Sequence, residues 1–306
     1  MQKKKENLKR FRTISEIHQA FGMPKPRHPL ISLTHFDENN PFNPEKIPVY
    51  DVLEFYKIAF TTENRGRMKY GQNYYDFTEG SMVFIAPNQV IGSSEDSDEH
   101  SSYILLIHPD FFLGYPLAGR IKQYGYFSYA VNEALHLSDD EKQVVLSILN
   151  IIELELNSRV DEFSQEVMIA QIELLLSYAN RFYKRQFITR KAVNDNLLQK
   201  LEAILDHYFD NEKSLMQGIP TVHYLADNLN TSPGYLSDML RSLTGQNTQQ
   251  HIHNKLIEKA KEKLSTTDLA VSEIAYQLGF EHPQSFSKLF RTKTKQSPLE
   301  FRASFN

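Results

Sequence analysis

Four polar residues near the end of the sequence share one face of a short helix that can begin at Pro283. Their spacing of i, i+3, i+4 and i+7 brings them side by side, and they are Gln284, Ser287, Lys288 and Arg291. In a DNA major groove, glutamine can bond bidentately to adenine, and lysine or arginine can bond to guanine O6 and N7. The later basic residues, Lys293, Lys295 and Arg302, suit backbone phosphates. This chemistry indicates a docking face rather than a catalytic centre.

A second copy of the pattern lies about 50 residues earlier in the chain. In the first helix of each copy, Leu225, Ala226 and Leu229 align with Ile274, Ala275 and Leu278 at an offset of 49. In the second helix, Pro233 to Arg241 align with Pro283 to Arg291 at an offset of 50. The outward positions of the earlier copy are Gly234, Ser237, Asp238 and Arg241. One structural unit has been copied, with one insertion in its turn.

Each copy has the pattern of a helix, a tight turn and a second helix. The turn residues Asn230 and Gly279 are of types that tolerate a left-handed backbone. A proline begins each second helix, where its missing N–H costs nothing, and Ser232 can cap the helix of the first copy. This is the helix-turn-helix pattern. Two such units in tandem are a much stronger signal than one.

A helical spacer separates the two copies. In "NTQQHIHNKLIEKAKEKL" the apolar residues have helical spacing, and they are Ile252, Leu256, Ile257, Ala260 and Leu264. About 17 helical residues span roughly 25 Å. A spacer of this length can set the second helices of both copies into successive major-groove segments, which lie roughly 34 Å apart on one DNA face.

Charge is unevenly distributed along the 306 residues, whose net charge is −4. Residues 1–190 hold 21 Lys/Arg and 25 Asp/Glu, residues 191–240 hold 3 and 7, and residues 241–306 hold 10 and 6. Of these three segments, the last suits a polyanion, although a solvated basic face is an equally simple interpretation of charge alone.

Composition sets further bounds. The 41% of hydrophobic residues is enough for two domains with packed cores. The absence of cysteine excludes thiol nucleophiles, thiolate metal ligands and disulfides. The N-terminal "MQKKKENLKRFR" is too polar for a signal peptide, and the apolar-rich stretch 144–156 is shorter than the roughly 20 residues that span a bilayer. We therefore expect a cytoplasmic protein without a membrane partner, and a solvated tail at residues 1–10 is favoured over a DNA-binding arm.

The N-terminal half changes from strand-like to helical. The predicted strands are 49–60, 74–77, 81–86 and 102–107, and their spacing favours a sandwich or small barrel. At Ser138 a capping box with Glu141 predicts a long helix, and a second helix follows at about 161–183. Both helices are apolar over more than one stripe, so the second apolar side either pairs with another subunit or packs within the chain. The polar segment "KRQFITRKAVNDN" is the predicted linker, with a domain boundary near 186–195.

Two stretches carry a resemblance to a known family. "LADNLNTSPGYLSDMLRSLTG" and "SEIAYQLGFEHPQSFSKLFRTKTKQSPLEFR" resemble the DNA-binding domain of AraC-type (AraC/XylS) transcription regulators over residues 195–306. The resemblance implies two helix-turn-helix units joined by a linker helix, with base-facing side chains at the outward positions named above. Gly234 and Asp238 depart from the family's pattern. We therefore expect the second unit to make most base contacts, unless Arg241 compensates.

The N-terminal part resembles the cupin-like β-barrel sensor domain that often precedes this module, with "HPDFF" and "YFSYAVNEALHLSDDEK" similar to one bacterial branch of these regulators. The resemblance implies dimerisation through the helices after the barrel. Six histidines precede residue 138, none of them two residues apart as in the His-x-His motif of cupin-type metalloenzymes: His18, His28, His35, His100, His108 and His136. His251 and His253 are two apart, but on a helix they point about 200° apart and cannot share an ion.

Other chemical motifs are missing from the sequence. It holds no phosphate-binding glycine loop and no Gly-x-Ser-x-Gly elbow, so we predict no catalytic residue, no metal and no cofactor. His108, at a strand end, is expected to be structural. Six side chains on or near the predicted strands either line a small-molecule site or fill a core, and the ligand site stays unassigned: Arg65, Arg67, Tyr70, Tyr74, Tyr75 and Phe77.

The sequence predicts an α+β multidomain protein with four segments. These are an arm and short helix at 1–28, a cupin-like β-barrel at 29–137, a helical dimerisation segment and linker at 138–190, and an all-α double helix-turn-helix domain at 191–306. The predicted function is sequence-specific regulation of transcription, without enzyme activity. The predicted partners are double-stranded promoter DNA, a second copy of the chain, RNA polymerase and a small-molecule effector. The alternatives are a cupin-type enzyme with an accessory DNA-binding tail, and an adaptor whose helical repeat binds protein.

Overall fold

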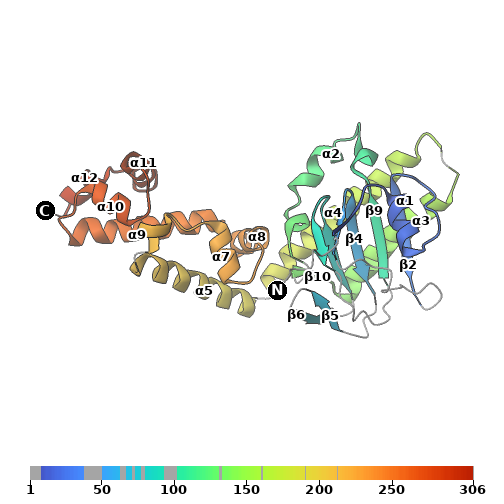
Figure 1. Ribbon diagram of the computed structural model, residues 1–306, viewed down its shortest axis with the longest axis horizontal. Helices are drawn as coiled ribbons and strands as arrows, with labels where there is room; N and C mark the ends of the chain where they lie inside the picture. The colour runs from blue at the N-terminus through green and yellow to red at the C-terminus, as the bar shows by residue number, and fades with distance from the viewer. Residues whose placement is uncertain are drawn as a thin grey trace, which may run out of the picture. The chain divides into compact units, whose positions relative to one another are not determined.

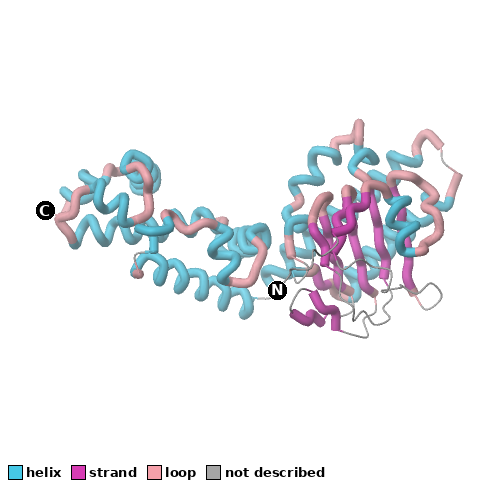
Figure 2. The backbone as a smooth tube through the Cα atoms, viewed as in Figure 1, coloured by secondary structure: helices cyan, strands magenta, loops and turns pink. Residues whose placement is uncertain are grey.

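The computed structural model describes residues 8–37, 50–62, 67–70, 73–76, 80–92, 102–130, 133–159, 161–189, 191–211 and 213–305. The chain divides into two compact units, Met1–Gln186 and Phe187–Asn306. In the described part, the strands belong to the first unit and the second unit is entirely helical (Figures 1 and 2). The α+β class of the chain is thus confirmed.

The largest sheet of the first unit has five antiparallel strands in the order β10-β7-β4-β9-β2. The strands are β2 (Ile31–Phe36), β4 (Tyr56–Thr61), β7 (Ser81–Ile85), β9 (Ser102–Ile107) and β10 (Leu135–His136). Along β4, buried residues alternate with half-buried ones, so Ile58 and Phe60 pack into the core. The strands predicted at 81–86 and 102–107 correspond to β7 and β9, whereas the segment predicted at 49–60 forms two strands, of which β4 is the second.

Two smaller sheets complete the described strands. β3 (Tyr50–Leu53) lies between β1 (Leu8–Phe11), with which it is parallel, and β8 (Val90–Gly92). β5 (Arg67–Tyr70) and β6 (Asn73–Asp76) form a hairpin. The described strands form no closed barrel, because β10 and β2 are the edges of the five-stranded sheet and pair with no other described strand. The cupin-like barrel stays a prediction.

Residues 8–10, part of the solvated tail that we expected at residues 1–10, belong instead to strand β1. β1 pairs with β3, and α1 (Ile14–Phe21) begins with a capping box between Thr13 and Glu16. Ile14 and Ile17 of this helix are buried in a core with Phe11 and Phe55. Burial of these apolar side chains holds β1 and α1 against the rest of the first unit. The charge pattern of the segment did not indicate this burial. Residues 1–7 lie outside the described part.

Short helices connect β9 to the long helices of the first unit. They are η2 (Pro109–Phe112), α2 (Leu117–Arg120), η3 (Ile121–Gln123) and η4 (Gly125–Ser128). His108 caps η2 by accepting from the amide of Asp110, as expected for a structural histidine. The Tyr126 hydroxyl donates to the carbonyl of Leu176, at 2.9 Å, and joins these turns to the helix behind them.

The two predicted long helices are α3 (Asp139–Asn157) and α4 (Ser164–Thr189). Ser138 and Glu141 form the predicted capping box of α3. Near the end of α4, Arg185 donates to the carboxylate of Glu141, and Gln186 accepts from the amide of His136. The predicted linker is largely helical: α4 continues to Thr189 and α5 (Lys191–Asp210) begins two residues later. Two lysines and two arginines, both good helix formers, occur in this segment. The division between the two compact units, after Gln186, lies within the predicted range of 186–195.

The second unit contains the two predicted helix-turn-helix copies. The first is α7 (Val222–Asn228) with α8 (Pro233–Thr244), and the second is α10 (Val271–Gln277) with α11 (Pro283–Thr294). α9 (Thr248–Thr266) joins them, α6 (Lys213–Gln217) precedes the first, and α12 (Pro298–Ala303) follows the second. Asn230 and Gly279 have φ of 54° and 90°, so both turns use the left-handed backbone that the sequence predicts. Ser232 caps α8, and a proline stands in the first turn of α8 and of α11.

The turn of the second copy packs directly against another backbone segment. A Cβ atom on Gly279 would lie 2.5 Å from the carbonyl carbon of Gly218 and 2.8 Å from the amide of Ile219. A Cβ atom on Gly218 would meet only the carbonyl oxygen of Gly279, at 3.6 Å. Both glycines have positive φ, at 77° for Gly218 and 90° for Gly279. Gly279 is thus required both by its positive φ and by the close approach of the Gly218 backbone, whereas Gly218 is required by its positive φ alone.

These two glycines provide a matched test of the turn. We expect Gly218→Ala to lower the free energy of unfolding by about 1 to 2 kcal/mol, the cost of a left-handed alanine. Gly279→Ala should cost clearly more, because the new methyl group also collides with backbone that cannot rotate away. Denaturant unfolding of the two full-length variants measures the difference. Equal losses would show that the backbone of residues 218–219 yields without cost.

Candidate nucleic-acid interface

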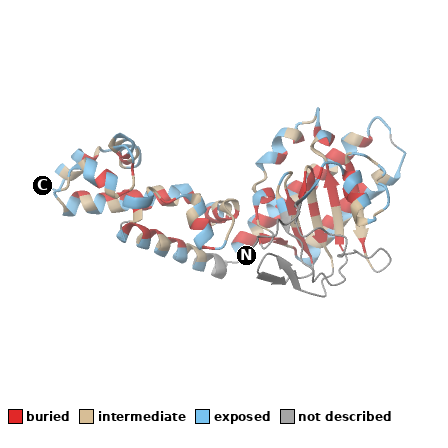
Figure 3. Ribbon diagram, in the orientation of Figure 1, coloured by how far each residue is buried: buried red, intermediate tan, exposed pale blue. Residues whose placement is uncertain are grey.

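α11 presents the predicted polar face to solvent because its opposite face is fixed by aromatic packing. Phe286 and Phe290 are buried, and their rings lie 5.5 Å from those of Phe280 and Phe301 respectively. On the outward face, Gln284, Lys288 and Arg291 are exposed and Ser287 is half-buried. Figure 3 shows this division into buried and exposed faces along the helices of the second unit. The predicted buried residue Leu289 is half-buried.

The basic side chains of α11 differ in what holds them. Lys288 and Arg291 form no ion pair within 4.0 Å in the described part of the chain. Lys293 donates to the side-chain oxygen of Asn254 at 3.2 Å, and Lys295 donates to the carbonyl of Thr292 at 3.2 Å. All four are exposed. The two nearest the centre of the helix are therefore available to an external anion.

Arg302 has a different role from the one that the sequence suggested. Its guanidinium donates to the carbonyls of Leu264 and Leu269, at 3.3 and 2.6 Å. These carbonyls lie at and just beyond the C-terminal end of α9, where helix carbonyls lack internal partners and attract a cation. Arg302 thus closes the end of α9 rather than facing a phosphate.

α8 has the same scaffold with a different outward face. Tyr235, Leu236, Met239 and Leu240 are buried as predicted, and Leu243 is half-buried. The Ser237 hydroxyl lies 2.9 Å from the hydroxyl of Thr248, which is fully buried at the start of α9. Arg241 donates through Nη1 to Oδ1 of Asp238 at 2.7 Å. The first outward face is therefore largely engaged within the chain, and Gly234 adds no side chain to it.

An ion-pair network between α5 and α9, which the sequence analysis missed, fixes the spacer helix. Glu202, Asp206 and Asp210 are four residues apart along α5, so they form one acidic stripe. Lys255 of α9 lies 3.0 Å from Asp206 and 3.7 Å from Glu202, and only 7% of its surface is exposed. Lys259 lies 2.7 Å from Asp210. The equal spacing of these charges was the available signal, but it does not show which helices meet.

Comparison with known proteins bears on the second unit. Residues 225–304 match the family model described as "Helix-turn-helix domain", over the stretch that carries the AraC-type motifs. The chain carries an AraC-type helix-turn-helix domain. It is 34% identical over 109 residues to "HTH-type transcriptional activator RhaS" of Enterobacter sp. (strain 638), covering 36% of this chain and 37% of RhaS.

Two further proteins are similar to part of the chain. The "Uncharacterized HTH-type transcriptional regulator YijO" of Escherichia coli (strain K12) is 30% identical over 105 residues, 34% of this chain and 36% of YijO. The C-terminal domain of the two-component response regulator yesN of Fusobacterium nucleatum is 31% identical, with 35% of this chain and 98% of that chain covered and a TM-score of 0.31. The chain thus spans little more than a third of the length of the two curated relatives.

The histidine pair in the AraC-type domain diverges as predicted. His251 lies 3.6 Å from Glu202 and 3.0 Å from the hydroxyl of Thr244, whereas His253 lies 3.0 Å from Gln249. In the described residues, no three His, Asp or Glu side chains are grouped as metal ligands would be.

Among the described helices, none has the length and apolar character needed to cross a membrane. Arg65, Phe77 and His100 lie outside the described part, and the structure places Arg67, Tyr70, Tyr74 and Tyr75 on the β5–β6 hairpin.

The α5–α9 network has a defined pH dependence. The hydrogen bond from Lys259 lowers the pKa of Asp210, and the same hydrogen bond raises the pKa of Lys259. The contribution of Asp210 to stability is therefore complete above the ordinary carboxylate pKa of about 3.9, and is lost as the pH falls through its lower folded-state pKa. The contribution of Lys259 is complete below about pH 10.4 and is lost as the pH rises through its higher folded-state pKa.

We expect Lys259→Gln to raise the pKa of Asp210 toward its ordinary value, because the variant removes the positive charge of the hydrogen-bond donor. Lys261→Gln is the matched control, since Lys261 lies on the same helix, over the ring of Phe301. An NMR pH titration of the Asp210 side chain in full-length protein measures both. A pKa of Asp210 that is the same in wild type and Lys259→Gln would contradict the paired geometry.

Proposed function

We propose that this protein is a sequence-specific regulator of transcription that binds double-stranded promoter DNA through α8 and α11. One observation carries the proposal: on α11 of the AraC-type domain, Lys288 and Arg291 are exposed and have no ion-pair partner in the described residues. A helix with such a face fits the major groove, where the two cations can bond to guanine. Lys293 and Lys295, near the end of the helix, suit the flanking phosphates, while Gln284 and Ser287 complete the base-facing side of α11.

A homodimer is part of the proposal, formed through the two long helices of the first unit. Exposed apolar side chains lie three residues apart on α3 and seven apart on α4, so each pair shares one helix face. They are Ile151 and Leu154 on α3, and Val167 and Leu174 on α4. An exposed apolar face of this kind marks an interaction site. A second copy of the chain is the occupant that the family resemblance implies.

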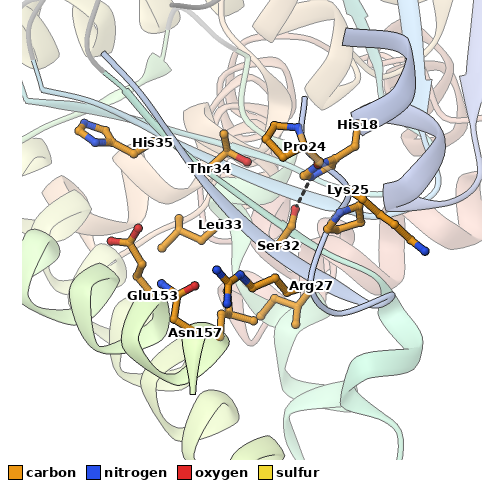
Figure 4. A pocket seen from close by; sticks show the side chains of 13 residues that line it. His18, Pro24, Lys25, Arg27, Ser32, Leu33, Thr34, His35, Glu153 and Asn157 are labelled. Carbon is orange, nitrogen blue, oxygen red and sulfur yellow. Dashed lines mark hydrogen bonds between the residues drawn. The ribbon is translucent and has the colours of Figure 1, made fainter. Parts of the chain in front are cut away.

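The first unit is proposed to be the sensor, cupin-like in ancestry, that responds to a small molecule. A cavity of about 270 Å³ lies between the loop after α1, strand β2 and helix α3 (Figure 4). Arg27 lines it from the loop, and Glu153 and Asn157 line it from α3. His18, which bonds to the carbonyl of Pro24 and the hydroxyl of Ser32, holds the loop against β2. A ligand here would touch the helix that carries the proposed dimer face, and so could favour one assembly over another.

RNA polymerase is included as a partner because a matched relative is named a transcriptional activator. A cytoplasmic location is proposed because the promoter DNA that a bacterial regulator binds lies in the cytoplasm. Two rival functions make different predictions. An enzyme with an accessory DNA-binding tail predicts a stoichiometric metal ion in purified protein, and a protein-binding adaptor predicts little loss of partner affinity with added salt.

The direct test is a binding selection from random duplex DNA with the full-length protein, repeated with and without candidate small molecules. The proposal predicts an enriched motif in two or more adjacent major-groove segments. Repetition of that motif at a fixed spacing would support the dimer. Binding without any enriched motif, at low salt and with every small molecule tried, would reject sequence-specific recognition.

Substitutions on α11 test its role as a reading helix. We expect Lys288→Ala and Arg291→Ala each to weaken binding to the selected operator by about 1 to 3 kcal/mol, because each removes a base contact. Lys122→Ala, which removes an equal charge from an exposed position of the first unit, is the control. Competition binding at fixed salt measures the three variants. Equal affinity of all three and wild type would remove α11 from the interface.

The dimer face is tested by adding a charge to it. We expect Leu154→Glu to weaken self-association more than tenfold, since burial of an unpaired carboxylate costs more than about 1.4 kcal/mol. Leu154 is 68% exposed. Leu299→Glu is matched to it, because Leu299 is 66% exposed but belongs to α12 of the second unit. Sedimentation at micromolar concentration distinguishes the variants, and a wild-type protein that is monomeric there would contradict the proposed dimer.

A further inference from the structure

The two helix-turn-helix copies differ at one outward position in a way that changes a neighbour. At the offset of 50, Asp238 corresponds to Lys288 and Arg241 corresponds to Arg291. On α8 the acidic residue accepts a hydrogen bond from Arg241 at 2.7 Å. On α11 the corresponding lysine cannot accept one, so two cations project together. The outward pair on α8 is therefore neutral and ordered, whereas the pair on α11 carries two positive charges.

The pairing on α8 leaves most of the arginine available. Asp238 takes one Nη1 donor of Arg241, and Nε and Nη2 have no partner in the described residues. A guanidinium has five donors in one rigid plane, and bidentate bonding to guanine O6 and N7 uses two of them. Arg241 remains exposed, with 56% of its side-chain surface accessible to solvent. One edge of the Arg241 guanidinium is therefore hydrogen-bonded, and another edge is available to a base.

The neighbouring outward position on α8 is already engaged. Ser237 shares a hydrogen bond with Thr248, a residue that is buried beneath it. In the second copy the position that corresponds to Thr248 is Pro298, which has no side-chain hydroxyl, and Ser287 forms no comparable bond in the described part. Gly234 contributes no side chain. Base reading by α8 therefore depends on Asp238 and Arg241.

We propose that Asp238 is a positioning residue, which holds the Arg241 guanidinium in the orientation that reads one guanine in the major groove. The inference rests on the proposed DNA-binding function and assigns different tasks to the two copies. α8 supplies base selectivity with little electrostatic attraction, because its charge pair is neutral. α11 supplies the attraction to phosphates as well as base contacts. An arginine that is already ordered loses less side-chain freedom on binding, which favours the one base that matches its geometry.

The test compares full-length Asp238→Asn, Asp238→Glu and Arg241→Ala with wild type. Lys288→Ala, at the position of α11 that corresponds to Asp238, is the control. For each protein, binding to the selected operator and to its single-base variants is measured at one salt concentration. Thermal unfolding of each protein confirms that the fold is unchanged.

We expect Arg241→Ala to remove a guanine preference of about 5- to 150-fold at one position. Asp238→Asn should reduce the preference at the same position several-fold, while affinity for the non-guanine variants is unchanged or higher because a negative charge near the phosphates is gone. Asp238→Glu should keep more of the preference than Asp238→Asn, since it retains the carboxylate. When Arg241 is already Ala, Asp238→Asn should have no further effect on the base preference at that position.

Three results would overturn the inference. Loss of a cytosine preference at a different position in Asp238→Asn would show that Asp238 reads a base itself. Unchanged profiles in both Asp238→Asn and Arg241→Ala, with a changed profile in Lys288→Ala, would show that α8 does not read bases, while the proposed function stands. Absence of any base preference in wild type would instead reject the proposed function.

Discussion

Burial of one face of α9 is the constraint on which the arrangement of the second unit depends. α9 contacts α8 of the first helix-turn-helix copy, α10 and α12 around the second, and α5 behind both. Ile252, Leu256 and Leu264 are buried along this face, so apolar contacts with both copies are made by one rigid element. Neither copy can turn about α9 without exposing part of that face. The positions of α8 and α11 are therefore set by the same helix (Figure 1).

Charge is distributed by the fold rather than by the overall composition. The acidic stripe of α5 neutralises Lys255 and Lys259, two of the cations in the basic C-terminal segment. The cations on the outer face of α11 have no such partners among the described residues. A chain with a net charge of −4 can thus present a positive surface locally. The paired lysines of α9 are neutralised by neighbouring carboxylates, whereas the cations of α11 are not, within the part of the chain that the structure describes. The proposed binding to DNA therefore depends more on close contacts than on long-range attraction.

Local signals predicted much of this structure. The capping box at Ser138, the left-handed turn at Gly279 and the proline at the start of α11 each involve residues a few positions apart, so the sequence shows both partners. Strand positions were also predictable, but their order was not, since pairing joins distant segments. The same limit applies at the candidate site. Arg302 closes α9 and Ser237 bonds to Thr248 because of tertiary contacts that no periodicity displays.

Duplication explains why the inward and outward faces of the two copies diverge to different degrees. Inward positions remain apolar in both copies: Leu236 corresponds to Phe286, and Leu240 corresponds to Phe290. Each of these side chains must fill a close-packed space against the first helix of its own copy. Outward positions touch solvent, so a change from lysine to aspartate costs the fold little. Asp238 and Lys288 occupy equivalent sites on the same scaffold, yet one orders an arginine and the other adds a charge. Packing thus preserves the frame on which the two helices present different outward side chains.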